Sequence, residues 1–197
     1  MKFKIDAKTL KDELTIIANV SDGSHPISSQ VFIESDGVGG VKLTTTDIDT
    51  TVQGKLEAEV SEEGSICVLA RRLLDIAKSV KGEIEFKKEP NSWVTVKAGK
   101  SKFKLAGLTS DQFPPIRTSE DVSIALNSEI FTKMIKSVIF AITNEETRYT
   151  LSGANLEIKD GTARMVATDG SRLSLIETAC NGEVSALIPK KALIQAS

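Results

Sequence analysis

Residues 122–142 read VSIALNSEIFTKMIKSVIFAI, and they repeat the layout of residues 3–20, FKIDAKTLKDELTIIANV. Each stretch begins with a short alternating run typical of a strand and continues with apolar residues at helical spacing. Helix start signals separate the two parts, at Asp6 to Lys8 in one stretch and at Asn127 and Ser128 in the other. The apolar helix positions are Leu10, Leu14, Ile17 and Ala18, and then Phe131, Met134, Ile135 and Val138. Both stretches therefore predict a strand followed by an amphipathic helix.

The repeat continues beyond these helices. Each copy then has alternating strands around a turn, and the pair Thr46-Asp47 of the first copy returns 122 residues later as Thr168-Asp169. Further on, Arg71-Arg72 aligns with Lys190-Lys191 at the start of a second helix in each copy. Three matches at offsets of about 120 residues indicate a duplicated structural unit.

The first copy goes on with strands EIEFKK, WVTVKA and KFKLAGL and a turn at residues 111–115, whereas the second stops inside its second helix at Ser197. We therefore predict an α+β fold made of repeated domains, each with two helices on one face of antiparallel sheets. The expected domains are residues 1–118 and residues 119–197, the second without its last strands. An amphipathic helix at the chain end still needs a sheet to cover it, so we expect a fragment of a longer protein.

Composition places the chain among ordinary folded proteins, with 40% hydrophobic and 26% charged residues. Cys67 and Cys180 have no CxxC or Cys/His spacing, so we expect two buried, reduced thiols. Charges occupy the N-terminal region where a signal peptide is apolar, and there is no apolar run of about 20 residues, the length that spans a bilayer. A cytoplasmic location is therefore expected.

The charge distribution is more informative than the net charge of -2. The spacing predicts helices over residues 8–19, 71–82, 127–142 and 190–196, and these helices contain more cations than acids. Selection for contact with a phosphate backbone explains this surplus, and so does the ordinary helix propensity of lysine and arginine on a solvated face. No base-stacking ladder or helix-turn-helix pattern is present, so binding without sequence specificity is expected. The cations are Lys8, Lys11, Arg71, Arg72, Lys78, Lys81, Lys133, Lys136, Lys190 and Lys191.

Catalytic signatures are missing from the sequence. There is one histidine, His25, and no GxSxG, P-loop, GxGxxG or HExxH pattern. Asp47 and Asp49 project to one side of a strand and leave open a small hydrolase or lyase that also uses His25. Asp169 is better interpreted as a turn residue before Gly170. The sequence favours a binding protein with no metal or cofactor, and a two-domain protein-interaction module without a DNA role is the other alternative.

Several motifs, in order and at similar spacing, resemble the bacterial DNA polymerase III beta sliding clamps. They cover the whole chain, and the Arg-Tyr and Ala-Thr-Asp-Gly-x-Arg-Leu stretches are the most specific. The resemblance implies a DNA-clamp fold with three domains per chain, of which the third is absent here, and two chains paired head to tail around duplex DNA. The motifs are Met-Lys-Phe at the start, residues 70–76, residues 111–114, residues 147–153 and residues 166–173.

The resemblance also implies a function and sites. The family is a polymerase processivity factor, and its partners are double-stranded DNA, the polymerase III alpha subunit, the clamp loader and other proteins with a clamp-binding motif. Thr150 and Asn144 depart from residues that some members have near Arg148, which predicts a weaker strand contact there. By similarity the DNA-binding residues are His25, Arg71, Arg72, Arg148 and Tyr149.

The family's second site is an apolar cleft for partner peptides. Its wall in this chain, by similarity, consists of Leu151, Thr168, Gly170, Arg172 and Leu173. Core packing is the alternative for the two leucines, whereas Arg172 is expected to pack its stem and keep its head in water. The last strand of the first copy carries Phe103 and Leu105 and is expected to form the dimer edge. Without a third domain, we expect the chain not to close a ring.

Overall fold

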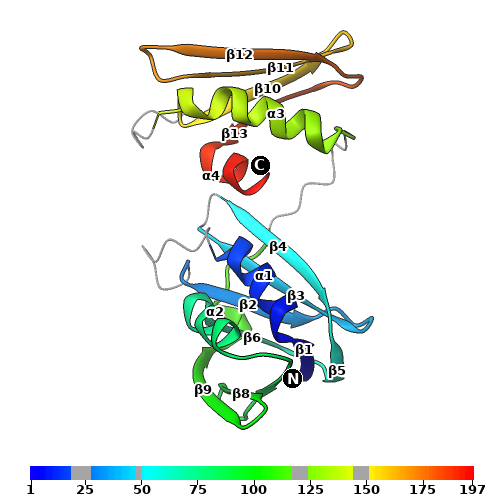
Figure 1. Cartoon of the computed structure of the whole chain (residues 1–197), viewed down its shortest axis with the longest axis vertical. Coiled ribbons are helices and arrows are strands. Elements are labelled where there is room, and N and C mark those ends of the chain that lie inside the picture. Colours follow the sequence, from blue (N-terminus) through cyan, green and yellow to red (C-terminus); the bar gives the residue numbers. More distant parts are fainter. Residues whose placement is uncertain (19–27, 48–49, 117–123, 144–150) are drawn as a thin grey trace. The chain divides into compact units, whose positions relative to one another are not determined.

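The computed structural model describes residues 1–18, 28–47, 50–116, 124–143 and 151–197. The chain divides into two compact units, Met1–Ile116 and Arg117–Ser197, each with its own hydrophobic core. Figure 1 shows helices packed against an antiparallel sheet in each unit. Within the described ranges, no helix has the length and apolar character needed to cross a membrane. The α+β class predicted from the sequence is confirmed.

The first unit is a nine-stranded sheet with the order β4-β3-β2-β6-β9-β8-β7-β1-β5. Alternate residues of its strands face the core, as Val31 and Ile33 do in β2 and Ile84 and Phe86 in β7. The strands are β1 Lys2–Asp6, β2 Gln30–Ser35, β3 Gly40–Thr46, β4 Thr51–Glu57, β5 Glu59–Glu62, β6 Ser65–Leu69, β7 Glu83–Lys88, β8 Trp93–Ala98 and β9 Ser101–Leu108.

Two helices, α1 (Ala7–Ile17) and α2 (Ala70–Ser79), pack against each other and against this sheet. The Asp6 carboxylate accepts hydrogen bonds from the backbone N–H groups of Lys8 and Thr9, which confirms the predicted start of α1. The apolar faces of the two helices are fully buried and form the centre of the first core. Their buried residues are Ala7, Leu10, Leu14 and Ile17 in α1, and Ala70, Leu73, Ile76 and Ala77 in α2.

The region from Thr51 onward forms two consecutive strands. These are β4 and β5, with a break at Ala58, where the Ala58 N–H donates to the Gly39 carbonyl over 3.3 Å. β4 pairs with β3, whereas β5 pairs with β1 at the other end of the sheet order. Consecutive strands therefore occupy the two ends of one sheet, an arrangement that local alternation does not encode.

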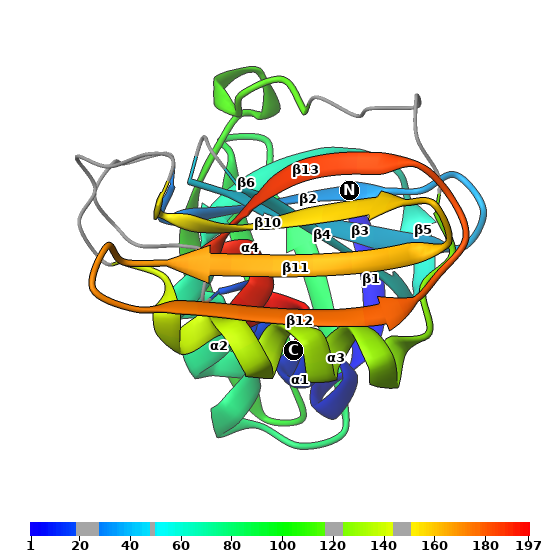
Figure 2. The ribbon, with the colours of Figure 1, turned by 90° about the horizontal axis from the view of Figure 1, so that it is seen from above.

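The second unit has a four-stranded sheet with the order β12-β11-β10-β13 (Figure 2). Its strands are β10 Gly153–Lys159, β11 Thr162–Thr168, β12 Leu173–Ala179 and β13 Val184–Pro189. Helices α3 (Ser128–Val138) and α4 (Lys190–Gln195) lie on one face of this sheet, and a short 3-10 turn, η2 (Ile139–Ala141), follows α3. The Asn127 side chain caps α3 by accepting from the N–H groups of Glu129 and Ile130, as the sequence predicts.

The internal repeat is visible in the strand order. β4-β3-β2-β6 in the first unit corresponds to β12-β11-β10-β13 in the second, and a helix follows β6 and β13 directly. In this alignment, the cross-strand pair Phe32 and Cys67 of β2 and β6 corresponds to the pair Asn155 and Leu187 of β10 and β13. Duplication of one strand-and-helix pattern thus produces the same local topology twice.

Two predictions about local structure need correction. Helix α2 ends at Ser79, so Lys81 lies beyond it and does not belong to the helical cations. Cys67 is buried with 2% exposure, but Cys180 is half-buried, and both thiols are free. Burial is the main cause that raises the pKa of the Cys67 thiol to about 11, which keeps it protonated.

A carboxylate with a lowered pKa stabilises the turn between β2 and β3. Asp36 Oδ1 accepts hydrogen bonds from the N–H groups of Val38 (2.9 Å) and Gly40 (2.8 Å), and Asp36 Oδ2 lies 3.0 Å from the Lys55 ammonium. The Val38 hydrogen bond, followed by Lys55, lowers the pKa of Asp36 from 3.8 to about 2. The ionised carboxylate therefore stabilises the fold above the ordinary pKa of an aspartate.

We expect Asp36→Asn to lower the melting temperature near neutral pH, because the variant keeps an acceptor oxygen but loses the charge that Lys55 neutralises. The stabilisation by the wild-type carboxylate is lost as the pH falls from 3.8 to about 2. The difference in melting temperature should therefore shrink over that interval when calorimetric scans are compared. A difference that stays constant down to the lowest pH would contradict this role for the charge.

Candidate functional site

Three of the helical cations of the first unit lie on the exposed side of α2. Arg71, Arg72 and Lys78 are exposed, whereas Leu73 and Ile76 on the other side of the helix are buried in the core. None of the three cations forms an ion pair with a described residue. Arginine and lysine side chains in this state can accept an anionic partner without first breaking an internal contact.

Helix α3 of the second unit carries a similar surface. Lys133 and Lys136 are exposed on this helix, beside polar side chains such as Thr132 and Ser137. Lys190, at the start of α4, is already engaged, since its ammonium donates to the Ile142 carbonyl over 3.2 Å. The α3 lysines are therefore the more available cations of this unit.

The predicted DNA-contact residues divide into two groups. Arg71 and Arg72 lie on the exposed face just described. His25, Arg148 and Tyr149 lie outside the described residues.

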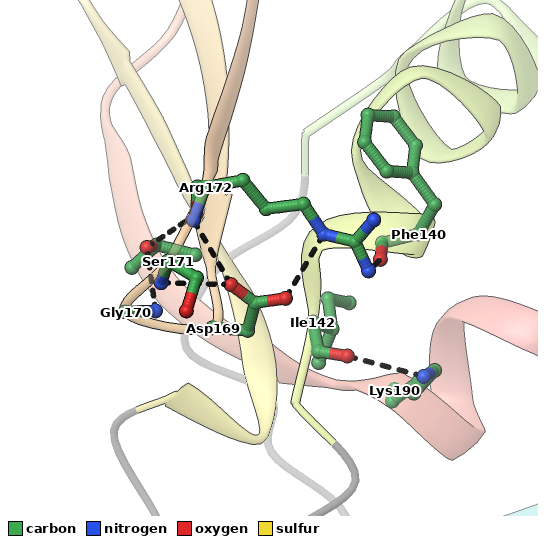
Figure 3. Close-up of polar contacts among 8 residues, drawn as sticks. Phe140, Ile142, Asp169, Gly170, Ser171, Arg172 and Lys190 are labelled. Carbon is green, nitrogen blue, oxygen red and sulfur yellow. Dashed lines mark hydrogen bonds and ion pairs between the residues drawn. The ribbon is translucent and has the colours of Figure 1, made fainter.

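A second candidate surface begins at the turn between β11 and β12 (Figure 3). Asp169 Oδ1 accepts hydrogen bonds from the N–H groups of Ser171 and Arg172, both at 3.0 Å. The Thr168 hydroxyl accepts from the Gly170 N–H and donates to the Arg172 carbonyl over 2.7 Å. Gly170 has φ +90, a conformation that suits glycine. The turn is thus fixed by its own short polar side chains, as the sequence predicts for Asp169.

Arg172 extends from this turn to the end of α3. Its Nε donates to Asp169 Oδ2 over 2.9 Å, its Nη2 donates to the Phe140 carbonyl over 2.8 Å, and its guanidinium carbon lies 5.5 Å from the centre of the Phe140 ring. Hydrogen bonds from the Ser171 and Arg172 N–H groups are the largest causes that lower the pKa of Asp169, and Arg172 also contributes through its side chain. The side chain of Arg172 is 59% exposed, so it is not part of the core.

The sequence pointed to Arg172 but not to Phe140. The two residues are 32 positions apart, and the contact uses a backbone carbonyl, which leaves no mark in the sequence. The available signal is the position of Phe140 at a helix end, where carbonyl groups lack intrahelical partners and attract cations.

One face of the second sheet is covered by α3 and α4, and the opposite face is called the outward face here. The outward face is apolar at the end nearest this turn. Leu173 is 65% exposed, Leu175 50% and Leu187 47%, and in the cross-strand register Val166 and the polar Asn155 lie between the last two. Leu151 is half-buried, and its carbonyl accepts from the Thr143 N–H over 3.3 Å. Leu173 is therefore not a core residue here, whereas Leu151 is partly covered.

In the first unit, the chain itself covers the equivalent face. The Phe113 ring, from the segment that follows β9, stacks on Phe32 with the ring centroids 5.1 Å apart, and Cys67 beside it is 2% exposed. By the repeat, the residue of the second unit that corresponds to Cys67 is Leu187.

Strand β9 has one free edge along most of its length. It pairs with β8 over residues 101–106, but on the other side only Gly107 and Leu108 pair, with β6. Phe103 and Leu105 are partly buried and pack against the core of their own unit. The backbone edge, more than these two side chains, is thus open to a further strand among the described residues.

The alternative acidic site receives no support from Asp47, whose Oδ1 accepts the Thr50 N–H over 2.7 Å and closes a turn. Asp49 and His25 lie outside the described residues. Among the residues that the structure describes, no three His, Cys, Asp or Glu side chains are grouped so that they could hold a metal ion.

Comparison with known proteins identifies the family. The model for the DNA polymerase III beta subunit, N-terminal domain, matches residues 1–117, and the model for its central domain matches residues 125–197. The beta sliding clamp of Pseudomonas aeruginosa is 30% identical over 205 residues, which cover 99% of this chain and 55% of the relative. This chain thus spans about half the length of the curated relatives it matches.

Comparison with solved structures indicates the same family. The DNA polymerase III subunit beta of P. aeruginosa superimposes with a TM-score of 0.92 at 29% identity, over 100% of this chain and 56% of that one. A sliding clamp of the same organism bound to griselimycin gives a TM-score of 0.86 at 31% identity, over 100% and 55%. Both units, their order and their fold therefore place this chain in the DNA polymerase III beta subunit family, the beta sliding clamps.

Proposed function

We propose that this chain is part of a DNA sliding clamp, a processivity factor that encircles duplex DNA and tethers the replicative polymerase, without catalysis of its own. The match to two consecutive family domains is the observation that carries the proposal. The exposed cations on α2 and α3 support it, because lysines and arginines without internal partners suit a phosphate backbone. Phosphate contacts alone carry no sequence information, as a protein that slides requires.

His25, Arg148 and Tyr149 complete the proposed DNA surface with Arg71 and Arg72. These assignments rest on the motifs that the chain shares with the family. In the full ring two chains pair head to tail, and the open edge of β9, with Phe103 and Leu105 behind it, is the proposed dimer edge.

The proposed partner site is the apolar end of the outward face in the second unit. It would receive short peptides from the polymerase III alpha subunit, the clamp loader and other clamp-binding proteins, on a wall formed by Leu151, Thr168, Gly170, Arg172 and Leu173. The exposure of Leu173 and Leu175 supports this, since apolar side chains grouped on a protein surface commonly mark a binding site.

Replacing both Arg71 and Arg72 by alanine is expected to weaken binding to a fluorescent duplex of random sequence. Each lost phosphate contact should also reduce the slope of log affinity against log salt by about 0.9, so the double variant should lose about 1.8. Fluorescence anisotropy at several salt concentrations measures both quantities.

The matched control removes two cations from the strands of the first sheet, Lys87 and Lys97, which are also exposed, with Lys97 lying 4.0 Å from the Glu85 carboxylate. The Lys87→Ala, Lys97→Ala variant should keep the wild-type affinity and slope. Equal losses in both double variants would show a general charge effect, and no salt dependence in the wild type would favour a protein-interaction module without a DNA role.

A further inference from the structure

We propose that Asp169 is a positioning residue for the partner site: its carboxylate holds Arg172 in the extended orientation in which Arg172 and Phe140 form one edge of the peptide-binding wall. The inference rests on the proposed partner site. It assigns a role to two residues, Asp169 and Phe140, that the family motifs do not place in the wall.

The two oxygens of Asp169 perform separate tasks. Oδ1 accepts both backbone N–H groups of the turn, at Ser171 and Arg172, and this keeps the turn closed. Oδ2 accepts the Arg172 Nε–H at 2.9 Å, which fixes the side chain rather than the backbone. A change confined to Oδ2 therefore separates side-chain positioning from turn formation.

Hydrogen bonds hold two of the three guanidinium nitrogens of Arg172. Nε and Nη2 are engaged with Asp169 and with the Phe140 carbonyl, whereas Nη1 makes no hydrogen bond with any described residue. The side chain is 59% exposed, and Phe140, over whose ring the guanidinium lies, is 54% exposed. The result is an ordered guanidinium and an aromatic ring, both open to solvent, immediately before the exposed Leu173.

Such ordering has a direct consequence for binding. A solvated arginine has many rotamers, and a ligand that contacts it must overcome the entropy of fixing them. With Asp169 in place, that entropy is lost during folding, before the ligand arrives. The competing explanation is that Arg172 only stabilises the fold. Arg172 donates a hydrogen bond to the carbonyl of Phe140, after the end of α3, just as Lys190 donates to the carbonyl of Ile142.

The test uses griselimycin, the molecule bound to the P. aeruginosa clamp, as the probe in calorimetric titrations. Asp169→Asn keeps an acceptor for the turn but replaces Oδ2 by a group that cannot accept from Arg172. We expect its affinity to fall about fivefold, the factor for ordering one flexible side chain. Arg172→Ala should weaken binding at least as much, and adding Asp169→Asn to Arg172→Ala should cause no further loss.

Glu177→Gln is the matched control, because Glu177 also pairs with an arginine, Arg164, on the same sheet at 2.6 Å. It should leave the affinity unchanged, and thermal unfolding establishes that every variant is folded. If Asp169→Asn binds like the wild type, or weakens binding equally in the Arg172→Ala background, Asp169 does not act through Arg172. If griselimycin fails to bind the wild type, or binds a Leu173→Ala variant as tightly as the wild type, the proposed partner site is wrong and the positioning role falls with it.

Discussion

Phe86→Ala is expected to lower the free energy of unfolding of the first unit by about 3–5 kcal/mol, the usual cost of removing a buried phenylalanine. Phe86 on β7 has no exposed surface, and its ring stacks on Phe3 with the centroids 4.7 Å apart. Phe3 is itself 1% exposed, so the substitution leaves a cavity that neighbouring side chains cannot easily fill. A domain with ordinary marginal stability would lose a large part of it.

The measurement is simple because Trp93 is the single tryptophan of the chain and lies on β8, which pairs with β7. Its fluorescence during urea denaturation therefore reports on the first unit. Phe86→Leu should cost less than Phe86→Ala, since most of the volume remains. Phe140→Ala, an exposed aromatic in the other unit, should leave the Trp93 midpoint in place. A Phe86→Ala midpoint equal to that of the wild type would show that the ring pair is not part of the folding core.

Gly153→Ala is expected to destabilise the second unit by about 1–3 kcal/mol, the range for overpacking a closely packed site. A Cβ at Gly153 would clash with the Ile188 carbonyl oxygen and would lie 3.3 Å from Leu187 Cδ1. The obstructing atom belongs to the backbone of β13, which is held by its pairing with β10 and cannot rotate away as a side chain could. β13 would have to shift, with a loss of its hydrogen bonds.

Whether Gly153→Ala lowers or raises stability decides if the close approach of β13 to Gly153 exists. Where space is available, replacing glycine by alanine stabilises a protein by about 0.4–1 kcal/mol, because the unfolded chain loses freedom. Asn155→Ala, two residues later on the exposed face of β10, serves as the control and should change stability little. Hydrogen exchange of β10 and β13 amides measures the loss, while Trp93 in the first unit should keep its midpoint. A stabilised Gly153→Ala variant would mean that the close approach is absent.

The candidate site was predictable to the extent that its chemistry is local. Helical spacing placed Arg71 and Arg72 on the exposed side of α2, because burial of Leu73 and Ile76 fixes the orientation of the whole helix. Turn chemistry likewise identified Asp169. The partner of Arg172 could not be predicted, since the Phe140 carbonyl meets the guanidinium only after α3 packs on the sheet.

Local sequence patterns are enough to predict the duplication, the α+β class, the helix starts at Asp6 and Asn127, and the alternation that buries one side of each strand. These features depend on side chains within a few positions of each other, where spacing and capping act directly. Long-range packing, in contrast, sets the break at Ala58 by which residues 51–62 reach both ends of one sheet, and the contact of Phe113 with Phe32. Such outcomes follow from which distant surfaces meet when the core closes, and local patterns do not carry that information.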